Sequence, residues 1–433
     1  MTGVPRRLGI VWLLLASFMA VGAAGARQAA SPLVLGDDPR IEAANLQVTV
    51  FAADVSFPLG MVALDDGSLL VGTSLPTGGS FFDSTGELVR FVDDDADGIA
   101  DTPGVTLASD LPGAITAVQR AGDLIYTMSI GSPTSVISVL RTGPAPADPL
   151  DWIGEIAITS DPATEHGSYA LAVRSDPDDS ARHDLFFNAG SLSNDTIGST
   201  VTLSGLATGT VRDATLNRLS VDTSGATPIF SNVTEIATGL RNAAGIAVDP
   251  ETGDLWLEDN GIDTPDVRIE ALSADELNQI EAGEIDDEAE DFGFPASYVD
   301  YQTGEAIGDG GVAPEVAFIP TDGQENEGAM QIAFMPPGLL PGVERGIAVG
   351  FHGQWDLTGL ANEENPLLIA DLTIGDSFPL IGNDDPNVGH LDGLLATDDA
   401  LYVADLTGTG SLAGVAAGGV IYRIAASDDA SAS

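Results

Sequence analysis

The chain has 433 residues, of which 66 are Asp or Glu and only 15 are Lys or Arg, so its formal net charge at neutral pH is -51. All fifteen of these basic residues are arginines. Nucleic acids and anionic membranes bind basic surfaces, so this composition argues against both as partners. The chain has no cysteine, which excludes disulfides, thiol catalysis and thiolate metal sites.

The N-terminus has the features of an export signal, predicted over residues 1–26. Arg6 and Arg7 form its charged region, an apolar run follows, and the small residues 24–26 suit a cleavage site. The apolar run is short for an uncleaved anchor, which is the alternative, and no later stretch reaches the roughly 20 apolar residues of a transmembrane helix. We therefore expect a secreted or periplasmic protein, soluble after cleavage, with an N-terminal extension over residues 27–44.

A short apolar strand, a turn rich in Asp, Gly, Pro or Asn, and a second apolar strand recur six times along the chain. The copies start about 50 to 85 residues apart, a spacing typical of four-stranded blades with loop insertions. Unrelated hairpins in a β-sandwich are the alternative, but a sandwich need not repeat one pattern. The sequence therefore predicts an all-β fold, a six-bladed β-propeller over residues 45–424, and a disordered acidic tail over 425–433. The copies occupy residues 60–73, 114–128, 169–189, 244–259, 329–350 and 392–405.

After the first copy, residues 93–101 match the calcium-loop pattern D-x-D-x-D-G-x-x-D. Carboxylates at alternate positions converge on a hard cation when the loop wraps, and the glycine permits the sharp turn. Glycine stands where an EF-hand carries its bidentate glutamate, so the loop is closer to short extracellular calcium turns. A solvated acidic turn between strands is the alternative. The candidate ligands of a structural Ca²⁺ are Asp93, Asp95, Asp97, the Ile99 carbonyl and Asp101.

Three of the four histidines stand at edges of the repeats, where propellers build their sites. His166 precedes the third copy, His352 follows the fifth, and His390 precedes the sixth. His183 falls in an acidic turn and is expected at the surface. A lone histidine is more often structural than catalytic, so position alone makes His166 no more than a candidate base.

Arg241 and Asn242 lie in a Gly-Leu-Arg-Asn segment just before the fourth copy. A guanidinium beside an amide can bind a carboxylate or a quinone oxygen through two hydrogen bonds. The alternative is an arginine that neutralises local acids in a chain full of carboxylates.

The segment 239–261 resembles the soluble quinoprotein glucose/sorbosone dehydrogenase family, whose members share this Gly-Leu-Arg-Asn start. Five other segments resemble the same family. They include Asp-Glu-Leu-Asn, Phe-Gly-Phe-Pro and a closing Ile-Tyr-Arg-Ile, and they lie within residues 166–177, 275–283, 292–295, 351–356 and 392–424.

The resemblance implies a propeller that binds pyrroloquinoline quinone (PQQ) and Ca²⁺ at the mouth of its channel and oxidises a sugar or a related alcohol or aldehyde. It implies that His166 is the base that takes the hydroxyl proton as hydride moves to the quinone. Arg241 would bind and polarise the quinone oxygens, with support from Asn242. The carbonyl oxygens of Gly261 and Ile262 would approach the cofactor-bound Ca²⁺.

The chain departs from the family at cationic positions. The family's Trp-Asn-Arg becomes Trp-Asp-Leu over residues 355–357, and His390 stands where relatives carry an arginine. His352 and His390 are therefore further candidates for cofactor binding. PQQ is a tricarboxylate, and a carboxylate without a counter-charge in a dry pocket is costly. Two alternatives stay open: a propeller of the same descent that has lost PQQ and serves as a binding or surface module, and a lactonase-like hydrolase that holds Ca²⁺ with carboxylates.

Overall fold

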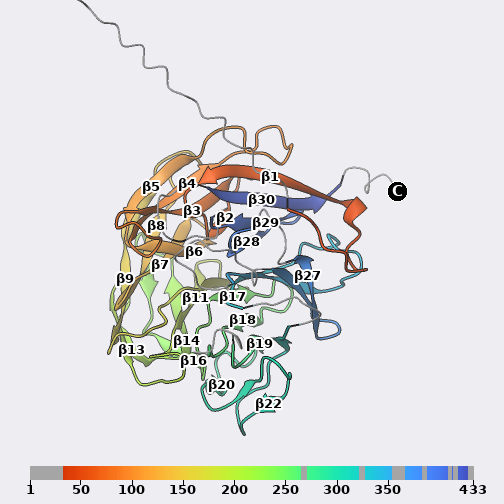
Figure 1. The fold of residues 1–433 in the computed structure, drawn as a ribbon. Coiled ribbons are helices and arrows are strands. Elements are labelled where there is room, and N and C mark those ends of the chain that lie inside the picture. Colours follow the sequence, from red (N-terminus) through yellow and green to blue (C-terminus); the bar gives the residue numbers. More distant parts are fainter. Residues whose placement is uncertain are drawn as a thin grey trace, which may run out of the picture.

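The computed structural model describes residues 33–264, 271–320, 327–353, 366–382, 388–407, 412 and 418–427. Within these residues the chain is all β, apart from one 3₁₀ turn, η1 (Ala43–Asn45), and contains no α-helix. Six sheets of four or more strands are arranged around a common axis (Figure 1). The predicted all-β, six-bladed β-propeller is confirmed.

The first three blades begin one after another along the chain, each at its innermost strand, and two strands that lie between β11 and β14 of blade 3 are added to blade 2. Blade 1 consists of β2 (Met61–Ala63), β3 (Leu69–Pro76), β4 (Ser84–Phe91) and β5 (Val105–Leu111). Blade 2 consists of β6 (Ala114–Ala121), β7 (Leu124–Ile130), β8 (Thr134–Arg141) and β9 (Asp151–Asp161), extended by β12 (Thr200–Gly205) and β13 (Gly209–Arg212). Blade 3 consists of β10 (Leu171–Ser175), β11 (Arg182–Ala189), β14 (Thr215–Asp222) and β16 (Thr234–Thr238), with the short strands β15 (Ile229–Phe230) and β20 (Glu290–Asp291).

The last three blades complete the circle. Blade 4 consists of β17 (Gly245–Val248), β18 (Leu255–Asp259), β19 (Asp275–Ile280) and β23 (Val316–Phe318), and its long insertion carries the hairpin of β21 (Tyr298–Val299) and β22 (Ala306–Ile307). Blade 5 consists of β24 (Ala329–Phe334), β25 (Gly346–Phe351), β26 (Leu367–Asp371) and β27 (Asp376–Ile381). Blade 6 consists of β28 (Gly393–Ala396), β29 (Ala400–Asp405), β30 (Gly419–Ala426) and β1 (Leu46–Val55).

In every blade, the two strands nearest the axis are the two strands of one predicted repeat. The second strand of a blade packs against neighbouring blades on both of its faces, and all seven residues of β7 are buried. A strand covered on both sides has no solvent face, so it appears as a continuous apolar run rather than an alternating one. Six hydrophobic clusters fill the spaces between adjacent blades.

The circle is closed by the two ends of the propeller. The innermost strands contact one another in the order β2, β6, β10, β17, β24, β28, and β28 contacts β2 again. Strand β1 pairs antiparallel with β30, from Leu46 opposite Ala426 to Val55 opposite Gly419. Strand β30 runs through Ala426, two residues past the expected end of the propeller at residue 424. The predicted leader and the last residues of the predicted tail, 428–433, lie outside the described residues.

Gln331 of β24 crosses the central channel. Its Nε2 donates to the Thr116 carbonyl of β6 at 2.7 Å, and its Oε1 accepts from the Leu394 amide of β28 at 3.0 Å. Strands β6 and β24 belong to opposite blades of the ring, so this side chain spans the axis. The channel is therefore interrupted by a hydrogen-bonded side chain instead of running open through the molecule.

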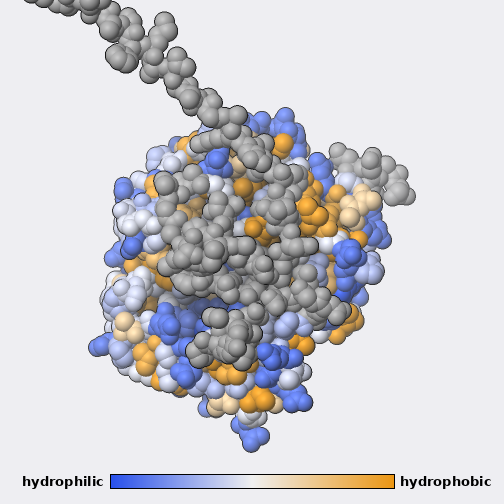
Figure 2. Space-filling model, in the orientation of Figure 1, coloured by the Kyte–Doolittle hydropathy of each residue, from blue (hydrophilic) through white to orange (hydrophobic). Residues whose placement is uncertain are grey.

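The surface reflects the acidic composition. Hydrophilic and hydrophobic residues are interspersed on the described part of the face drawn in Figure 2. No helix among the described residues is long and apolar enough to cross a lipid bilayer.

Candidate active site

The loops that carry the candidate site residues are held by buried acceptor side chains near the ends of second strands. In three blades, one such side chain accepts hydrogen bonds from two consecutive backbone amides in the segment that leads into the first strand. Each pair of amides is thereby satisfied without water, and the loop is fixed relative to its own blade. The acceptors are Asn188 for Tyr169 and Ala170 (2.8 and 3.0 Å), Asp259 for Arg241 and Asn242 (2.9 and 2.7 Å), and Asp405 for Gly389 and His390 (2.9 and 3.0 Å).

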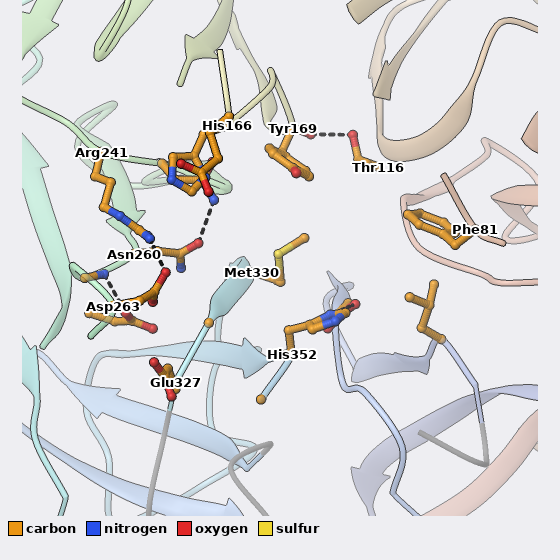
Figure 3. A pocket seen from close by; sticks show the side chains of 18 of the residues that line it. Phe81, Thr116, His166, Tyr169, Arg241, Asn260, Asp263, Glu327, Met330 and His352 are labelled. Carbon is orange, nitrogen blue, oxygen red and sulfur yellow. Dashed lines mark hydrogen bonds and ion pairs between the residues drawn. The ribbon is translucent and has the colours of Figure 1, made fainter. Parts of the chain in front are cut away.

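A cavity of about 520 Å³ lies where these loops meet at one end of the axis (Figure 3). Its wall combines segments that precede first strands with segments that follow second strands, so residues far apart in the sequence converge there. Five of the predicted site residues line it: His166, Arg241, Asn242, Gly261 and His352.

His166 presents a neutral imidazole to this cavity. Its Nε2 is buried and has no hydrogen-bond partner among the described residues, while its backbone amide donates to the Ser191 carbonyl. Burial, together with the nearby charge of Arg241, lowers the pKa of His166 to about 3. Both effects disfavour the imidazolium, so the ring keeps a lone pair available at neutral pH.

Arg241 lies almost fully buried in the cavity wall, with a side chain only 4% exposed. Its Nη2 donates to Asp263 Oδ2 at 2.5 Å and to Asn194 Oδ1 at 2.8 Å, and its Nε donates to the Asn194 carbonyl at 3.2 Å. Both interpretations of this arginine from the sequence therefore have support. It faces the predicted pocket, and it also neutralises a neighbouring acid.

Asn242 is tied to the floor of the cavity by its amide nitrogen. Its Nδ2 donates to Asn260 Oδ1 at 2.8 Å, and Asn260 in turn donates to Glu258 at 3.1 Å and to the Ala329 carbonyl at 2.6 Å. The Oδ1 of Asn242 is buried and has no partner among the described residues. The cavity wall thus contains a second unsatisfied acceptor near Arg241.

Gly261 and Ile262 occupy different positions. Gly261 lines the cavity, and its amide donates to Asp275 Oδ1 at 2.7 Å. The side chain of Ile262 is buried behind the wall, in a hydrophobic cluster with Phe294. Its carbonyl oxygen accepts hydrogen bonds from the amides of residues 272–273 at 2.6 and 3.2 Å. Of the two carbonyls predicted to approach Ca²⁺, the Ile262 carbonyl is thus engaged within its own loop.

His352 and His390 form a stacked pair, with ring centroids 4.1 Å apart and planes 13° from parallel. His352 Nδ1 lies 2.7 Å from Asp392 Oδ2, and His390 Nδ1 lies 2.5 Å from the His352 carbonyl oxygen. His352 lines the cavity, whereas His390 is fully buried behind it. Glycine is required at position 389, because a Cβ there would overlap the Thr407 carbonyl oxygen.

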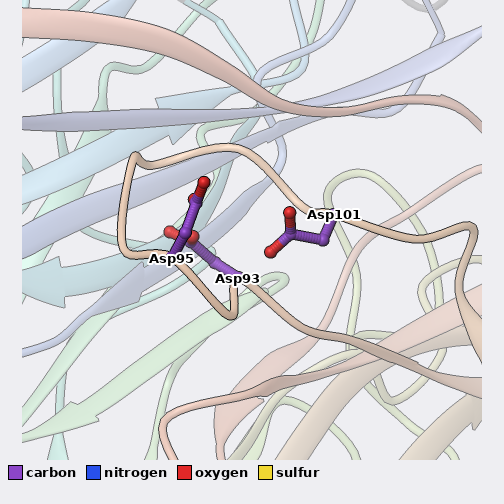
Figure 4. Close-up of side chains that lie close together, drawn as sticks. All are labelled: Asp93, Asp95 and Asp101. Carbon is purple, nitrogen blue, oxygen red and sulfur yellow. The ribbon is translucent and has the colours of Figure 1, made fainter.

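The predicted calcium loop lies away from the cavity. It joins β4 to β5, at the end of blade 1 opposite the β3–β4 loop that reaches the cavity. Ligand atoms of Asp93, Asp95 and Asp101 lie within 4.8 Å of one another (Figure 4). Asp97 instead accepts from the Ile99 amide at 2.9 Å. The carboxylate charge of Asp97 is the main cause of the raised pKa of Asp95, as expected for acids that crowd together without a counter-ion.

This loop also contacts the closing strand β1. The Thr49 hydroxyl donates to the Gly98 carbonyl at 3.0 Å, and the Ala100 amide donates to the Phe51 carbonyl at 2.8 Å. A cation bound by the loop would therefore stabilise the contact between the first blade and the strand that closes the ring.

The expectation that His183 lies at the surface is wrong. The turn ends earlier than the acidic run suggests, and His183 is already the second residue of β11. Its ring is buried, with Nε2 2.8 Å from the Tyr126 hydroxyl of the neighbouring blade. His183 therefore contributes to the packing between two blades and does not belong to the candidate site.

The other arginines do not supplement Arg241. Arg174 pairs with Asp184 and Arg345 with Asp249, and neither lines the cavity. Arg268, like the stretch 355–357 that replaces the family's Trp-Asn-Arg, lies outside the described residues. Among the described arginines, Arg241 alone lines the cavity.

Most ionisable residues of the cavity wall are carboxyl groups, and none of them was predicted from the sequence as a site residue. Two of them precede strands β10 and β24, and Asp275 lies in β19 with both oxygens accepting from buried amides. The sequence gives one indication of these carboxyl groups, because an acidic residue recurs at or next to the edges of the repeats. An acidic turn at the surface would give the same pattern. The carboxyl groups of the wall belong to Glu165, Asp263, Asp275, Glu327 and Asp392.

Several acids in the wall and near it have raised pKa values. Burial raises the pKa of Asp275 to about 6, those of Asp259 and Asp405 to about 7, and that of Glu276 to about 8. It raises the pKa of Glu258 well above its ordinary value. Among the described residues, none of these acids belongs to a group of three close enough to share a metal ion. A lactonase-like metal site held by carboxylates therefore has no counterpart in the described wall.

Three solved structures share this fold over most of the chain. The chain aligns with the PQQ domain of pyranose dehydrogenase from Coprinopsis cinerea, in its holo form, at 15% identity over 93% of this chain and 99% of that one, with a TM-score of 0.59. It aligns with a Trichoderma reesei protein of Carbohydrate-Active Enzymes Family AA12, in a calcium structure, at 16% identity over 92% and 98%, with a TM-score of 0.59.

A third solved structure is that of a putative oxidoreductase (glucose dehydrogenase) from Thermus thermophilus, at 16% identity over 88% of this chain and 99% of that one, with a TM-score of 0.51. No protein-family model matches the chain, and no curated protein matches it. The resemblance seen in the sequence is therefore confirmed as a shared fold: this is a six-bladed propeller of the type found in PQQ-dependent sugar dehydrogenases.

Proposed function

We propose that this protein is an exported oxidoreductase that oxidises a sugar or a related alcohol or aldehyde, with His166 as the base. The observation that carries the proposal is the unpartnered Nε2 of His166 beside Arg241 and Asn242 in a cavity of about 520 Å³. Oxidation of a hydroxyl to a carbonyl removes a proton from oxygen and a hydride from carbon. A neutral imidazole can accept that proton, as general-base catalysis requires.

PQQ is the oxidant that the shared fold suggests, and the residues fit its quinone end. Arg241 supplies a guanidinium for carbonyl oxygens, and two unsatisfied acceptors, His166 Nε2 and Asn242 Oδ1, indicate a ligand with hydrogen-bond donors. His352, which stacks on His390 behind the wall, is a further candidate for contact with PQQ. When bound, PQQ supplies a two-electron acceptor for the hydride.

The three carboxylates of PQQ have a less favourable environment. The described wall offers one guanidinium, already paired with Asp263, against five carboxyl groups. Ca²⁺ is the counter-ion that the resemblance implies, and hard cations bind carboxylate and carbonyl oxygens such as that of Gly261. We therefore expect PQQ to bind this chain only in the presence of a divalent cation.

The unsatisfied acceptors in the cavity also favour a second candidate function. In this function the propeller binds a polyhydroxylated ligand without PQQ. In that case the cavity and its unsatisfied acceptors serve recognition alone, and Arg241 serves only to neutralise Asp263.

Reconstitution separates the two functions. Purified protein is titrated with PQQ with and without Ca²⁺, and dye reduction is followed with a panel of aldoses and alcohols. The dehydrogenase proposal predicts Ca²⁺-dependent PQQ binding and turnover. PQQ binding too weak to detect, with no turnover at any PQQ concentration, would leave the binding module as the function.

His166→Ala should reduce turnover by about 10²- to 10⁴-fold, the usual contribution of a general base, with PQQ affinity nearly unchanged. His183→Ala is the matched control, because that ring is buried between blades away from the cavity. Equal activity of His166→Ala and the parent protein would remove His166 from the role of base.

A further inference from the structure

The cavity has two chemically different sides (Figure 3). Hydrogen-bonding side chains lie on one side, among them Arg241, Asn260 and Asp263. Tyr169 and Phe81 lie on the opposite side, which we call the apolar wall. A molecule that spans the cavity therefore meets polar groups at one end and apolar groups at the other.

The apolar wall is the surface of a hydrophobic cluster to which blades 1, 2 and 6 contribute. Leu59, Phe81 and Leu406 are at most 3% exposed, belong to the buried part of this cluster and also line the cavity. Tyr169 is partly buried and packs against the cluster. The apolar character of this wall is therefore built into the fold and does not depend on one surface side chain.

Hydrogen bonds and ring contacts hold the apolar wall in place. The Phe81 amide donates to the Leu412 carbonyl at 2.9 Å, and the Phe81 ring meets the Phe57 ring edge-on, with centroids 5.6 Å apart. The Tyr169 carbonyl accepts from the Thr116 hydroxyl at 2.7 Å. A wall fixed in this way loses little conformational freedom when a ligand packs against it, which favours binding.

One short segment joins the two sides of the cavity. His166 and Tyr169 are three positions apart in the segment that leads into β10, and both line the cavity. A substrate whose hydroxyl reaches His166 Nε2 thus has the apolar wall close to its neighbouring atoms. Met330 of β24 adds a flexible apolar side chain to the lining.

The composition of the wall indicates what packs against it. A sugar ring or a quinone can stack on the flat face of an aromatic side chain. Leu59, Leu406 and Met330 offer no such face, and what they favour is the removal of apolar surface from water. The wall therefore suits an alkyl or aryl group better than a further sugar ring.

We propose that the substrate is amphipathic: a sugar or related alcohol that carries an alkyl or aryl group, with its reacting hydroxyl at His166 and its apolar group against Phe81, Tyr169 and Met330. The inference rests on the proposed function, because it names the class of substrate that the same site oxidises. Each methylene group buried against the wall should raise the affinity roughly fourfold.

The test is binding of two series of compounds to the full chain by calorimetry in the absence of PQQ. One series consists of methyl, butyl and hexyl β-glucosides, and the other of 1,2-propanediol and 1,2-hexanediol. The series share the apolar chain but differ in the polar end, so the result does not depend on glucose being the correct sugar.

We expect butyl glucoside to bind at least tenfold more tightly than methyl glucoside, at one molecule per chain. The heat-capacity change of binding should become more negative as the chain lengthens, which is the mark of buried apolar surface. An increase of affinity with chain length in either series supports the proposal. Affinities that do not change with chain length, or no binding of any of these compounds, would overturn it.

Variants locate the effect. Met330→Gln keeps the length of the side chain but makes it polar, and should lower the ratio of butyl to methyl glucoside affinity several-fold. Met330→Leu should keep the ratio. The matched control is Ile229→Gln, the same kind of change at a residue that is 67% exposed and does not line the cavity. An equal fall in this control would show that the chains adsorb outside the cavity, and the proposal would fail.

The same series in protein loaded with PQQ and Ca²⁺ separates the substrate from the cofactor as the occupant of the apolar wall. We expect the dependence on chain length to persist. Its disappearance would show that the quinone covers the wall, which would overturn the proposal.

The outcome is separable from that of the proposed function. If affinity rises with chain length but no compound supports dye reduction, the oxidoreductase proposal fails and the apolar subsite stands. If sugars and alcohols are oxidised with a kcat/KM that is independent of chain length, the oxidoreductase stands and the apolar subsite fails.

Discussion

His166 illustrates how one residue acquires chemistry from its surroundings. Its pKa is lowered because the ring is buried and faces a guanidinium, not because of its neighbours in the sequence. Arg241 acquires its position in the same way, through a backbone amide bonded to Asp259 and a side chain bonded to Asp263. At this scale the site consists of groups whose charges are set by burial.

The raised pKa of Glu276 predicts how the stability of the protein depends on pH. Glu276 has a pKa near 8 in the folded protein, against about 4.3 in an unfolded chain. Between pH 6.5 and 8.5 the folded state loses a proton that the unfolded state has already lost, so stability falls as the pH rises. For Glu276 alone the expected loss is about 2 kcal/mol over this range.

The measurement is the melting temperature between pH 6.5 and 8.5, for the parent protein and for Glu276→Gln. The variant keeps an acceptor for the Val299 amide but cannot titrate, so its melting temperature should fall less steeply. Glu251→Gln, on an exposed turn, should leave the slope unchanged. A slope that Glu276→Gln does not alter would show that this carboxyl is not the titrating group.

At the scale of elements, the calcium loop and the closing strand form one unit. The loop between β4 and β5 bonds directly to β1, which pairs with β30. These hydrogen bonds close the ring, because the first strand of the propeller completes the blade formed by its last three strands. Ca²⁺ at Asp93, Asp95 and Asp101 remains a prediction.

We expect Ca²⁺ to raise the melting temperature of the parent protein, with about 2.7 kcal/mol of stabilisation at a hundredfold excess over its dissociation constant. Asp101→Asn should abolish most of this effect, because it removes one of the three converging carboxylates. Asp178→Asn, in another exposed acidic turn, is the matched control. A calcium effect that persists in full in Asp101→Asn would place the ion elsewhere.

At the scale of the molecule, the net charge of -51 opposes compactness. The described arginines are largely used in local pairs with acids, such as Arg90 with Asp66 and Arg212 with Glu235, which leaves most carboxylates repelling one another. Self-repulsion of this kind destabilises the folded state and is reduced by salt.

The urea midpoint of unfolding should therefore rise when NaCl is increased from 0.01 to 1 M, as the screening length falls from roughly 30 to 3 Å. Sucrose, which screens no charge, distinguishes electrostatic stabilisation from general exclusion of cosolvent. A midpoint that responds to sucrose but not to NaCl would contradict this account.

The architecture was readable from the sequence because propeller blades repeat one local pattern. The hairpin of β17 and β18 and that of β28 and β29 carry the same apolar strands and acidic turns, and periodicity of this kind is local information. The position of His166, Arg241 and Asn242 at repeat edges is also local information, and the structure places all three in the wall of the cavity.

The sequence contains no local pattern that predicts the other parts of the site. Glu327 and Asp392 come from neighbouring blades and line one cavity, and His183 is buried because Tyr126 of the neighbouring blade covers it. The closing pair of β1 and β30 joins residues nearly four hundred positions apart, beyond any local pattern.

The sequence by itself determined the strands, their grouping into six blades and the acidic character of the molecule, since these follow from periodicity and composition. Only the tertiary structure decided which acids face the cavity, that Arg241 is already paired with Asp263, and that Gln331 crosses the channel. The reason is physical: burial, pairing and the pKa of a group depend on what packs against it from other blades, and no single stretch of sequence contains that contact.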